Sequence, residues 1–200
     1  NIYNQNSDNS DVVFRMARSV FLKAMEEKNK NKQIKYYYEG FEYAKKALRL
    51  DSENGYVNFW YAAYIGRIGE IEGIKQGILN SYEVQKYGER ALKFKPDYEH
   101  SHHLMARWNY ELADLSQFER MIASIVYAKP PYGSYKDAAQ LFQNAININP
   151  DEIRHHFWLA KTYYAMKEYS LSKREFQITI SLTPKDEEDR QMQSKSKKYF

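Results

Sequence analysis

Apolar residues recur along the chain with the spacing of an α-helix. The first such segment, residues 11–28, places seven apolar side chains on one helical face: Val12, Val13, Met16, Ala17, Val20, Phe21 and Ala24. The pattern predicts an amphipathic helix that packs this face against a neighbour.

Four later segments end in a similar way, as "KALRLDSEN", "RALKFKPDYE", "NAININPDE" and "ITISLTPKDE". Aligned on the proline position, which a serine occupies in the first segment, the four ends fall at Ser52, Pro96, Pro150 and Pro184, with spacings of 44, 54 and 34 residues. Proline has no N–H to continue a helical hydrogen-bond ladder, so each of these ends predicts the close of a helix.

The last spacing equals the tetratricopeptide period of about 34 residues. That repeat follows W-x2-L-G-x2-Y, then A-x3-F, then P, and the last unit fits it with His156, Leu159, Ala160, Tyr163, Ser172, Phe176 and Pro184. The longer spacings then come from insertions between the two helices of a pair. The sequence therefore predicts an all-α, tetratricopeptide-like solenoid of helical hairpins with inserted segments and essentially no strand.

Short capping signals place the inserted elements. Asn80-x-x-Glu83 predicts a helix over 81–95, and Ser116-x-x-Glu119 predicts a short extra helix. Pro130, Pro131 and Gly133 would end that helix, and Ser134-x-x-Asp137 would begin the next one.

The last segment is mostly polar, with acids early and lysines late, as expected for the terminal capping helix of a solenoid. Thr183 is its predicted N-cap and Pro184 its first residue. At the other end, residues 1–10 are polar and predict a tether, which leaves residues 11–200 as a single helical-repeat domain.

Composition narrows the function classes. The 200 residues contain 30 Lys and Arg against 26 Asp and Glu, a net charge of +4 that is too mild to argue for nucleic acid. No cysteine is present, which excludes disulfides and cysteine-held metals. The longest charge-free run, residues 138–150, is too short to span a bilayer.

Candidate catalytic or metal-binding groups are few. His102 and His156 occupy the Trp position of the repeat, which predicts packing, whereas His100 and His103 share another face without an H-E-x-x-H motif. The sequence has no Gly-rich phosphate loop, nucleophile elbow or nucleophilic cysteine. We therefore expect a protein that is not an enzyme, with no catalytic residue, no metal site and no cofactor.

The first helix of each pair lines the concave face of such a solenoid. One stripe per helix mixes basic and aromatic side chains, a composition that suits an acidic or aromatic peptide segment. The predicted partner-binding residues are Tyr56, Phe59, His103, Arg107, Tyr110, Arg154, Phe157, Lys161 and Tyr164.

Most of the chain, from about residue 43 to 184, resembles the regulator of microtubule dynamics family. The most specific marks are Trp60, the pair "RW" at 107–108 and "KPP" at 129–131, while Asn58 and Ala106 depart from the family pattern. The resemblance implies a tetratricopeptide-like fold, a role in protein association and, upstream of residue 1, a membrane tether. A member of this kind would be exported or membrane-tethered, in the cell envelope if bacterial, with a cytoplasmic location as the alternative.

The function expected from these observations is a non-enzymatic adaptor that binds a protein partner in its concave groove. Two alternatives stay open: a module that holds a lipid or small apolar ligand, and a structural subunit of a larger assembly. A continuous apolar groove would favour the ligand-binding module over the adaptor.

Overall fold

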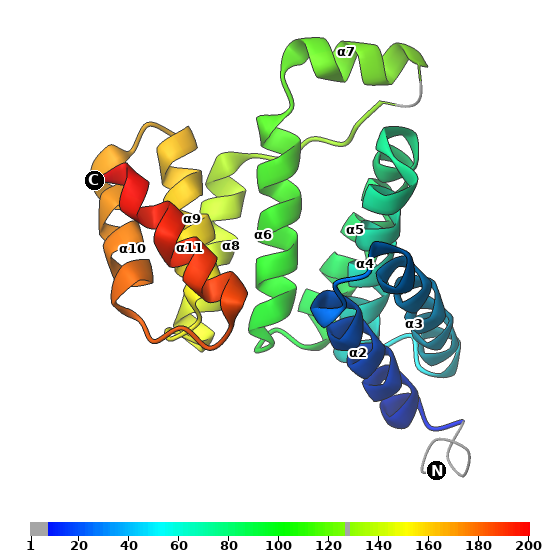
Figure 1. Cartoon of the computed structure of the whole chain (residues 1–200). Helices are drawn as coiled ribbons and strands as arrows, with labels where there is room; N and C mark the ends of the chain where they lie inside the picture. The colour runs from blue at the N-terminus through cyan, green and yellow to red at the C-terminus, as the bar shows by residue number, and fades with distance from the viewer. Residues whose placement is uncertain (1–7, 127–128) are drawn as a thin grey trace. The chain divides into compact units, whose positions relative to one another are not determined.

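The computed structural model describes residues 8–126 and 129–200, and this part of the chain is helical with no strand (Figure 1). The all-α prediction is confirmed. The elements in order are α2 (Ser10–Glu26), α3 (Lys30–Leu50), α4 (Gly55–Glu72), α5 (Ile74–Phe94), α6 (Glu99–Asp114), α7 (Gln117–Val126), α8 (Tyr135–Ile148), α9 (Ile153–Ala165), α10 (Tyr169–Ser181), α11 (Glu187–Ser196) and the 3-10 helix η1 (Lys197–Tyr199).

The helices pack in four successive pairs: α2 with α3, α4 with α5, α6 with α8, and α9 with α10. The second helices of these pairs end at Leu50, Phe94, Ile148 and Ser181. Each of them ends two or three residues before the corresponding aligned position, which is Ser52, Pro96, Pro150 or Pro184. Within the described residues, α3 also packs on α4 and α8 on α9, so the two pairs of each unit cover one another. The predicted helical-hairpin repeats are confirmed.

The chain forms two compact units. The first comprises residues up to Pro96 together with 117–131, and the second comprises residues 97–116 together with 132–200. That residues 11–200 form a single domain stays a prediction. Residues 1–7 of the predicted tether lie outside the described residues, while Asn9 caps α2 by accepting from the Asp11 amide at 2.9 Å.

A buried tyrosine joins three helices of the first unit. The Tyr64 hydroxyl, on α4, donates to the carbonyl of Ala17 on α2 at 2.6 Å. Gly40 on α3 makes room for this ring, because a Cβ at that position would lie 1.9 Å from the Tyr64 oxygen. The Phe21 ring meets Tyr64 edge-on at 5.1 Å. The three helices therefore pack around the Tyr64 side chain, whose buried hydroxyl keeps a hydrogen-bond partner.

The first insertion extends a helix instead of forming a separate segment. α5 begins at Ile74, directly after Gly73 with its φ of 95°. The predicted cap at Asn80 is therefore wrong, because Asn80 lies inside α5 and its amide donates to the Ile65 carbonyl at 2.9 Å. A Cβ at Gly69 would lie 3.0 Å from the Cα of Gly77, so these two glycines allow α4 and α5 to approach closely.

The second insertion forms the predicted extra helix, α7. The next helix begins as expected, since the Ser134 hydroxyl accepts from the Asp137 amide at 3.0 Å and caps α8. The Ser134 hydroxyl also donates to the Asp137 carboxylate at 2.7 Å. This reciprocal pair satisfies an amide at the start of α8 and fixes the first residue of the helix.

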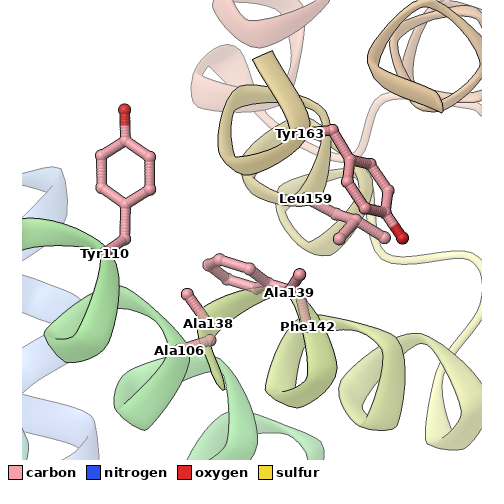
Figure 2. Packing of buried hydrophobic residues seen from close by; sticks show 7 residues of the cluster. All are labelled: Ala106, Tyr110, Ala138, Ala139, Phe142, Leu159 and Tyr163. Atoms are coloured by element: carbon pink, nitrogen blue, oxygen red, sulfur yellow. The ribbon is translucent and has the colours of Figure 1, made fainter. Parts of the chain in front are cut away.

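The core of the second unit lies between α6, α8 and α9. Figure 2 shows the Phe142 ring of α8 between the small side chains of α6 and α8 and the larger ones of α9. The buried members of this cluster are Ala106, Tyr110, Ala138, Ala139, Phe142, Leu159 and Tyr163. Alanines at the helix contacts let the backbones approach, as the repeat pattern requires.

The polar C-terminal helix is present, but it begins later than predicted. α11 starts at Glu187, and the Asp186 side chain caps it by accepting from the Asp189 amide at 2.8 Å. Thr183 is therefore not the N-cap, and Pro184 lies outside the helix. Figure 1 shows α11 lying across α9 and α10, where Met192 joins the buried cluster of Ile153, Phe157, Ala160 and Phe176.

Candidate protein-binding surface

The nine predicted partner-binding residues divide between the two units and differ in exposure. Tyr56 and Phe59 belong to the first unit, where Tyr56 stacks on Phe14 with ring centroids 5.5 Å apart. Three of the nine are buried, with 6–8% of their surface exposed: Phe59, Tyr110 and Phe157. A partner that binds without disturbing the core can contact little of these three rings. Direct contact would therefore come from the other six predicted residues.

The second unit brings two predicted cations onto one indole ring. The Arg107 guanidinium of α6 lies 3.5 Å from the ring centroid of Trp158, on α9. The Lys161 ammonium lies 4.2 Å from the same centroid and 5.1 Å from the Tyr110 ring. We call Arg107, Trp158 and Lys161 the cation–indole cluster; two cations at these distances interact with the negative faces of the aromatic rings.

The two cations of the cluster differ in their polar partners. Arg107 pairs with Glu111, one turn along α6, at 2.8 Å. No hydrogen bond or ion pair links the Lys161 ammonium to any residue of 8–126 or 129–200. Burial, followed by the charge of Arg107, lowers the pKa of Lys161 although Glu111 and Asp114 oppose the shift. This ammonium can therefore still donate to an incoming anion.

Three exposed tyrosines, one each on α9, α10 and η1, contact one another beyond this cluster. Tyr164, one turn after Lys161, has 49% of its surface exposed. Its ring meets Tyr169 and Tyr199 edge-on, with centroids 5.4 and 5.1 Å apart. Tyr199 in turn stacks on the buried Phe176 at 4.1 Å, so the exposed rings rest on the core and are held in place.

Arg154, also predicted to bind a partner, already has partners within the chain. Its guanidinium pairs with Glu152 at 3.0 Å, with Glu188 at 3.4 Å and with Asp186. The last two carboxylates belong to α11 and its cap, and Lys185 adds a 3.2 Å bridge to Glu152. Arg154 thus attaches α11 to α9, and its charge is largely compensated without a ligand.

His103 is half-buried and bonded to a second histidine. The Nδ1 atoms of His103 and His155 are 2.9 Å apart, and the His103 ring meets Phe142 edge-on at 5.3 Å. Burial is the main cause that lowers the pKa of His103 well below 6.5 and that of His155 to about 3, and neighbouring charges add to it. With both rings neutral, one Nδ1–H donates to the other Nδ1, so the contact is a structural hydrogen bond.

The packing predicted for His156 is confirmed, whereas His102, at the equivalent repeat position, is only partly buried. His156 is buried, as its repeat position predicts, and its two ring nitrogens contact Glu175 at 2.7 Å and the Pro150 carbonyl at 2.9 Å. Among the described residues, no three His, Asp or Glu side chains are grouped as metal ligands would be. No helix in the described part of the chain has the length and apolar character needed to cross a membrane.

Trp158, the ring at the centre of the cluster, was not among the residues predicted from the sequence. A stripe of one residue per turn along α9 contains Arg154, Phe157 and Lys161 but not position 158. A helix face is wider than one residue, and positions i+3 and i+4 both lie beside i. Trp158 is four residues from Arg154 and three from Lys161, so a wider stripe would have included it.

Comparison with known proteins decides the family. The model of the family described as Regulator of microtubule dynamics protein 1-3 matches residues 1–200. The chain belongs to this family. Regulator of microtubule dynamics protein 1 of Bos taurus is 30% identical over 192 residues, which cover 95% of this chain and 61% of that protein. Protein 3 of Xenopus laevis is 27% identical, over 92% of this chain and 40% of its own length.

The chain spans about 60% of the length of the first two curated relatives it matches, those of Bos taurus and Mus musculus. Solved structures support the fold. A thermophilic TPR protein of Thermus thermophilus matches 90% of this chain and 80% of its own, with a TM-score of 0.59 and 11% identity. MamA matches 99% and 80%, with a TM-score of 0.56 and 12% identity. The chain is thus a tetratricopeptide-like helical scaffold of this family, an architecture that typically associates with other proteins.

Proposed function

We propose that this family member is an adaptor that binds an acidic, aromatic-containing segment of a protein partner at the cation–indole cluster of its second unit. The observation that carries the proposal is the Lys161 ammonium, which is half-buried beside Arg107 and has no acceptor in the part of the chain described. A carboxylate of the partner would supply that acceptor. The exposed Tyr164 ring would contact an aromatic side chain of the partner.

The mixed character of this surface supports a peptide over a lipid. A site for an acyl chain needs a continuous apolar lining, whereas the cluster places two cations and Glu111 around one indole ring. Charged hydrogen bonds that exclude water contribute about 1.5–3 kcal/mol each. Loss of both cations should therefore weaken binding of an acidic segment by roughly 100-fold or more.

The test is fluorescence anisotropy with a short labelled peptide rich in Glu and Tyr. We expect the wild-type chain to bind and Arg107→Ala with Lys161→Ala to lose binding, with unchanged helicity and melting temperature. The matched control is Lys173→Ala with Arg174→Ala, which removes the same charge from an exposed part of α10. Equal loss in the control would mean that net charge, and not the cluster, holds the peptide.

The proposed role of Lys161 also predicts a pH dependence. An anionic segment binds the protonated amine, and the pKa of Lys161 is lowered. Affinity should therefore fall as pH rises, beginning at a lower pH than an ordinary lysine would give. Lys161→Arg keeps its charge and should remove this dependence. A pH profile that is the same for both proteins would exclude Lys161 from the site.

The relatives are named as regulators of microtubule dynamics, so assembled microtubules are the second probe. Co-sedimentation of the wild-type chain that is lost in Arg107→Ala with Lys161→Ala, and retained in Lys173→Ala with Arg174→Ala, would identify the microtubule surface as a partner. Co-sedimentation unaffected by all four substitutions would place microtubule binding elsewhere on the chain.

A further inference from the structure

The extra helix α7 has its apolar side facing solvent. Its large side chains fall at positions i, i+3, i+4 and i+7, which form one helical face. Phe118 is 65% exposed and Ile125 77% exposed. The exposed large apolar residues of α7 are Phe118, Met121, Ile122, Ile125 and Val126.

The opposite side of α7 is the one that faces the protein. Ala123 is its buried residue. The Arg120 guanidinium donates to the carbonyls of Pro130 and Pro131, at 3.5 and 2.9 Å, and so ties the helix to the chain that returns from it. The Tyr82 hydroxyl of α5 donates to the Lys129 carbonyl at 2.6 Å and attaches that returning chain to the first unit.

Within the first unit, no other described helix packs extensively along α7, and Figure 1 shows it apart from α2–α5. A soluble protein rarely leaves a contiguous apolar face uncovered unless something binds there. The arrangement holds the helix firmly by its polar side and presents the apolar side outward, which is the orientation an interfacial amphipathic helix needs.

The size and geometry of this face select among the partners. Five large apolar side chains of one ten-residue helix make up this face. A stable protein interface takes about 20–30 residues and buries about 800 Å² on each partner, which is more than this face supplies to a second copy.

A flat, deformable, apolar acceptor fits what remains. We propose that α7 is a membrane-docking element that lies in the interface of a lipid bilayer and inserts Phe118, Met121, Ile122 and Ile125 among the acyl chains. The polar side of the helix carries Glu119 and Arg120, whose charges offset each other. Docking therefore depends on apolar insertion and needs little attraction from anionic lipid.

Vesicle flotation tests this with the whole chain. We expect the wild type to float with phosphatidylcholine vesicles, and to do so in high salt. Met121→Ser with Ile125→Ser should lower the bound fraction by roughly tenfold or more. Ile74→Ser is the matched control, since this isoleucine on α5 is 73% exposed against 77% for Ile125 and lies outside α7; it should bind as the wild type does.

A second readout reports insertion directly. Because the chain has no cysteine, Val126→Cys and Ile74→Cys can each carry one environment-sensitive dye. The dye at 126 should shift its emission to shorter wavelength when vesicles are added, and the dye at 74 should not. Both variants can be checked for unchanged helicity before labelling.

Several outcomes overturn the proposal. Equal flotation of the wild type and the Met121→Ser, Ile125→Ser variant would show that α7 is not the contact. Binding that needs phosphatidylserine and disappears in salt would show an electrostatic surface instead of insertion. Self-association of the wild type in sedimentation, lost in the same variant and without vesicle binding, would assign the face to a second copy of the chain.

Discussion

The pair formed by His103 and His155 predicts that acid destabilises the second unit well before its carboxylates are protonated. Both rings stay neutral in the folded protein because burial lowers their pKa values, to about 3 for His155 and well below 6.5 for His103. In the unfolded chain each ring takes up a proton as pH falls through about 6.5. The unfolded state then binds more protons than the folded state, so stability falls with pH.

The magnitude follows from the interval between the two pKa values. For each ring that stays neutral in the folded protein, the free energy of unfolding falls by about 1.36 kcal/mol per pH unit below the pKa of that ring in the unfolded chain. Between neutral pH and about pH 5 that is about 2 kcal/mol for His155, and the lowered pKa of His103 adds a loss in the same direction. For His155 the loss should continue until its folded pKa of about 3.

The assay is chemical denaturation at several pH values, followed by tryptophan fluorescence. In a Trp60→Phe background the remaining reporters, Trp108 and Trp158, both lie in the second unit. His103→Asn with His155→Asn keeps a pair of polar side chains but removes the titration. Its free energy of unfolding should change at least about 2 kcal/mol less than that of the parent between neutral pH and about pH 5. The same pH slope in both proteins would refute the neutral buried pair.

Three further predictions concern packing. Phe176→Ala removes a fully buried ring and should destabilise by about 3 kcal/mol or more, seen as a lower melting temperature; an unchanged melting temperature would contradict the repeat alignment. Gly40→Ala places a Cβ 1.9 Å from the Tyr64 hydroxyl and should cost about 1–3 kcal/mol in a denaturation titration, whereas the wild-type value would show that the ring can move freely. Arg154→Ala leaves Asp186 and Glu188 without their Arg154 partner and should cost roughly 2 kcal/mol, with faster amide exchange in α11; unchanged exchange there would show that Arg154 does not hold the helix.

The sequence predicted the repeats because their signals are local. Proline after a helix, small residues at helix contacts and the Ser134–Asp137 cap each act within a few residues. The prediction failed where a distant residue decides. Asn80 has the sequence context of a cap, but its amide bonds to Ile65 across the close contact of Gly69 and Gly77, and the helix continues through it.

The candidate binding residues show the same division. Sequence position placed Arg107 and Lys161 correctly on facing helices, because both occupy equivalent places in successive repeats. It could not show that Arg154 is paired with the acids around the start of α11, which lie more than thirty residues further along the chain. The acids at that end were expected to serve only the helix dipole, and their second role depends on the packing of α11 against α9.

Periodicity alone also does not tell which medium an apolar face meets. α2 and α7 both carry apolar residues at helical spacing, and in α2 this face is buried, with Val13 and Ala17 fully covered. In α7 the spacing is equally regular, yet the covered residue is Ala123 and Ile125 faces solvent. The difference arises because Arg120 binds the carbonyls of Pro130 and Pro131 and so fixes the polar side of α7 inward. An apolar stripe therefore predicts that a helix has a partner, and the polar contacts on the other side decide whether that partner belongs to the same chain.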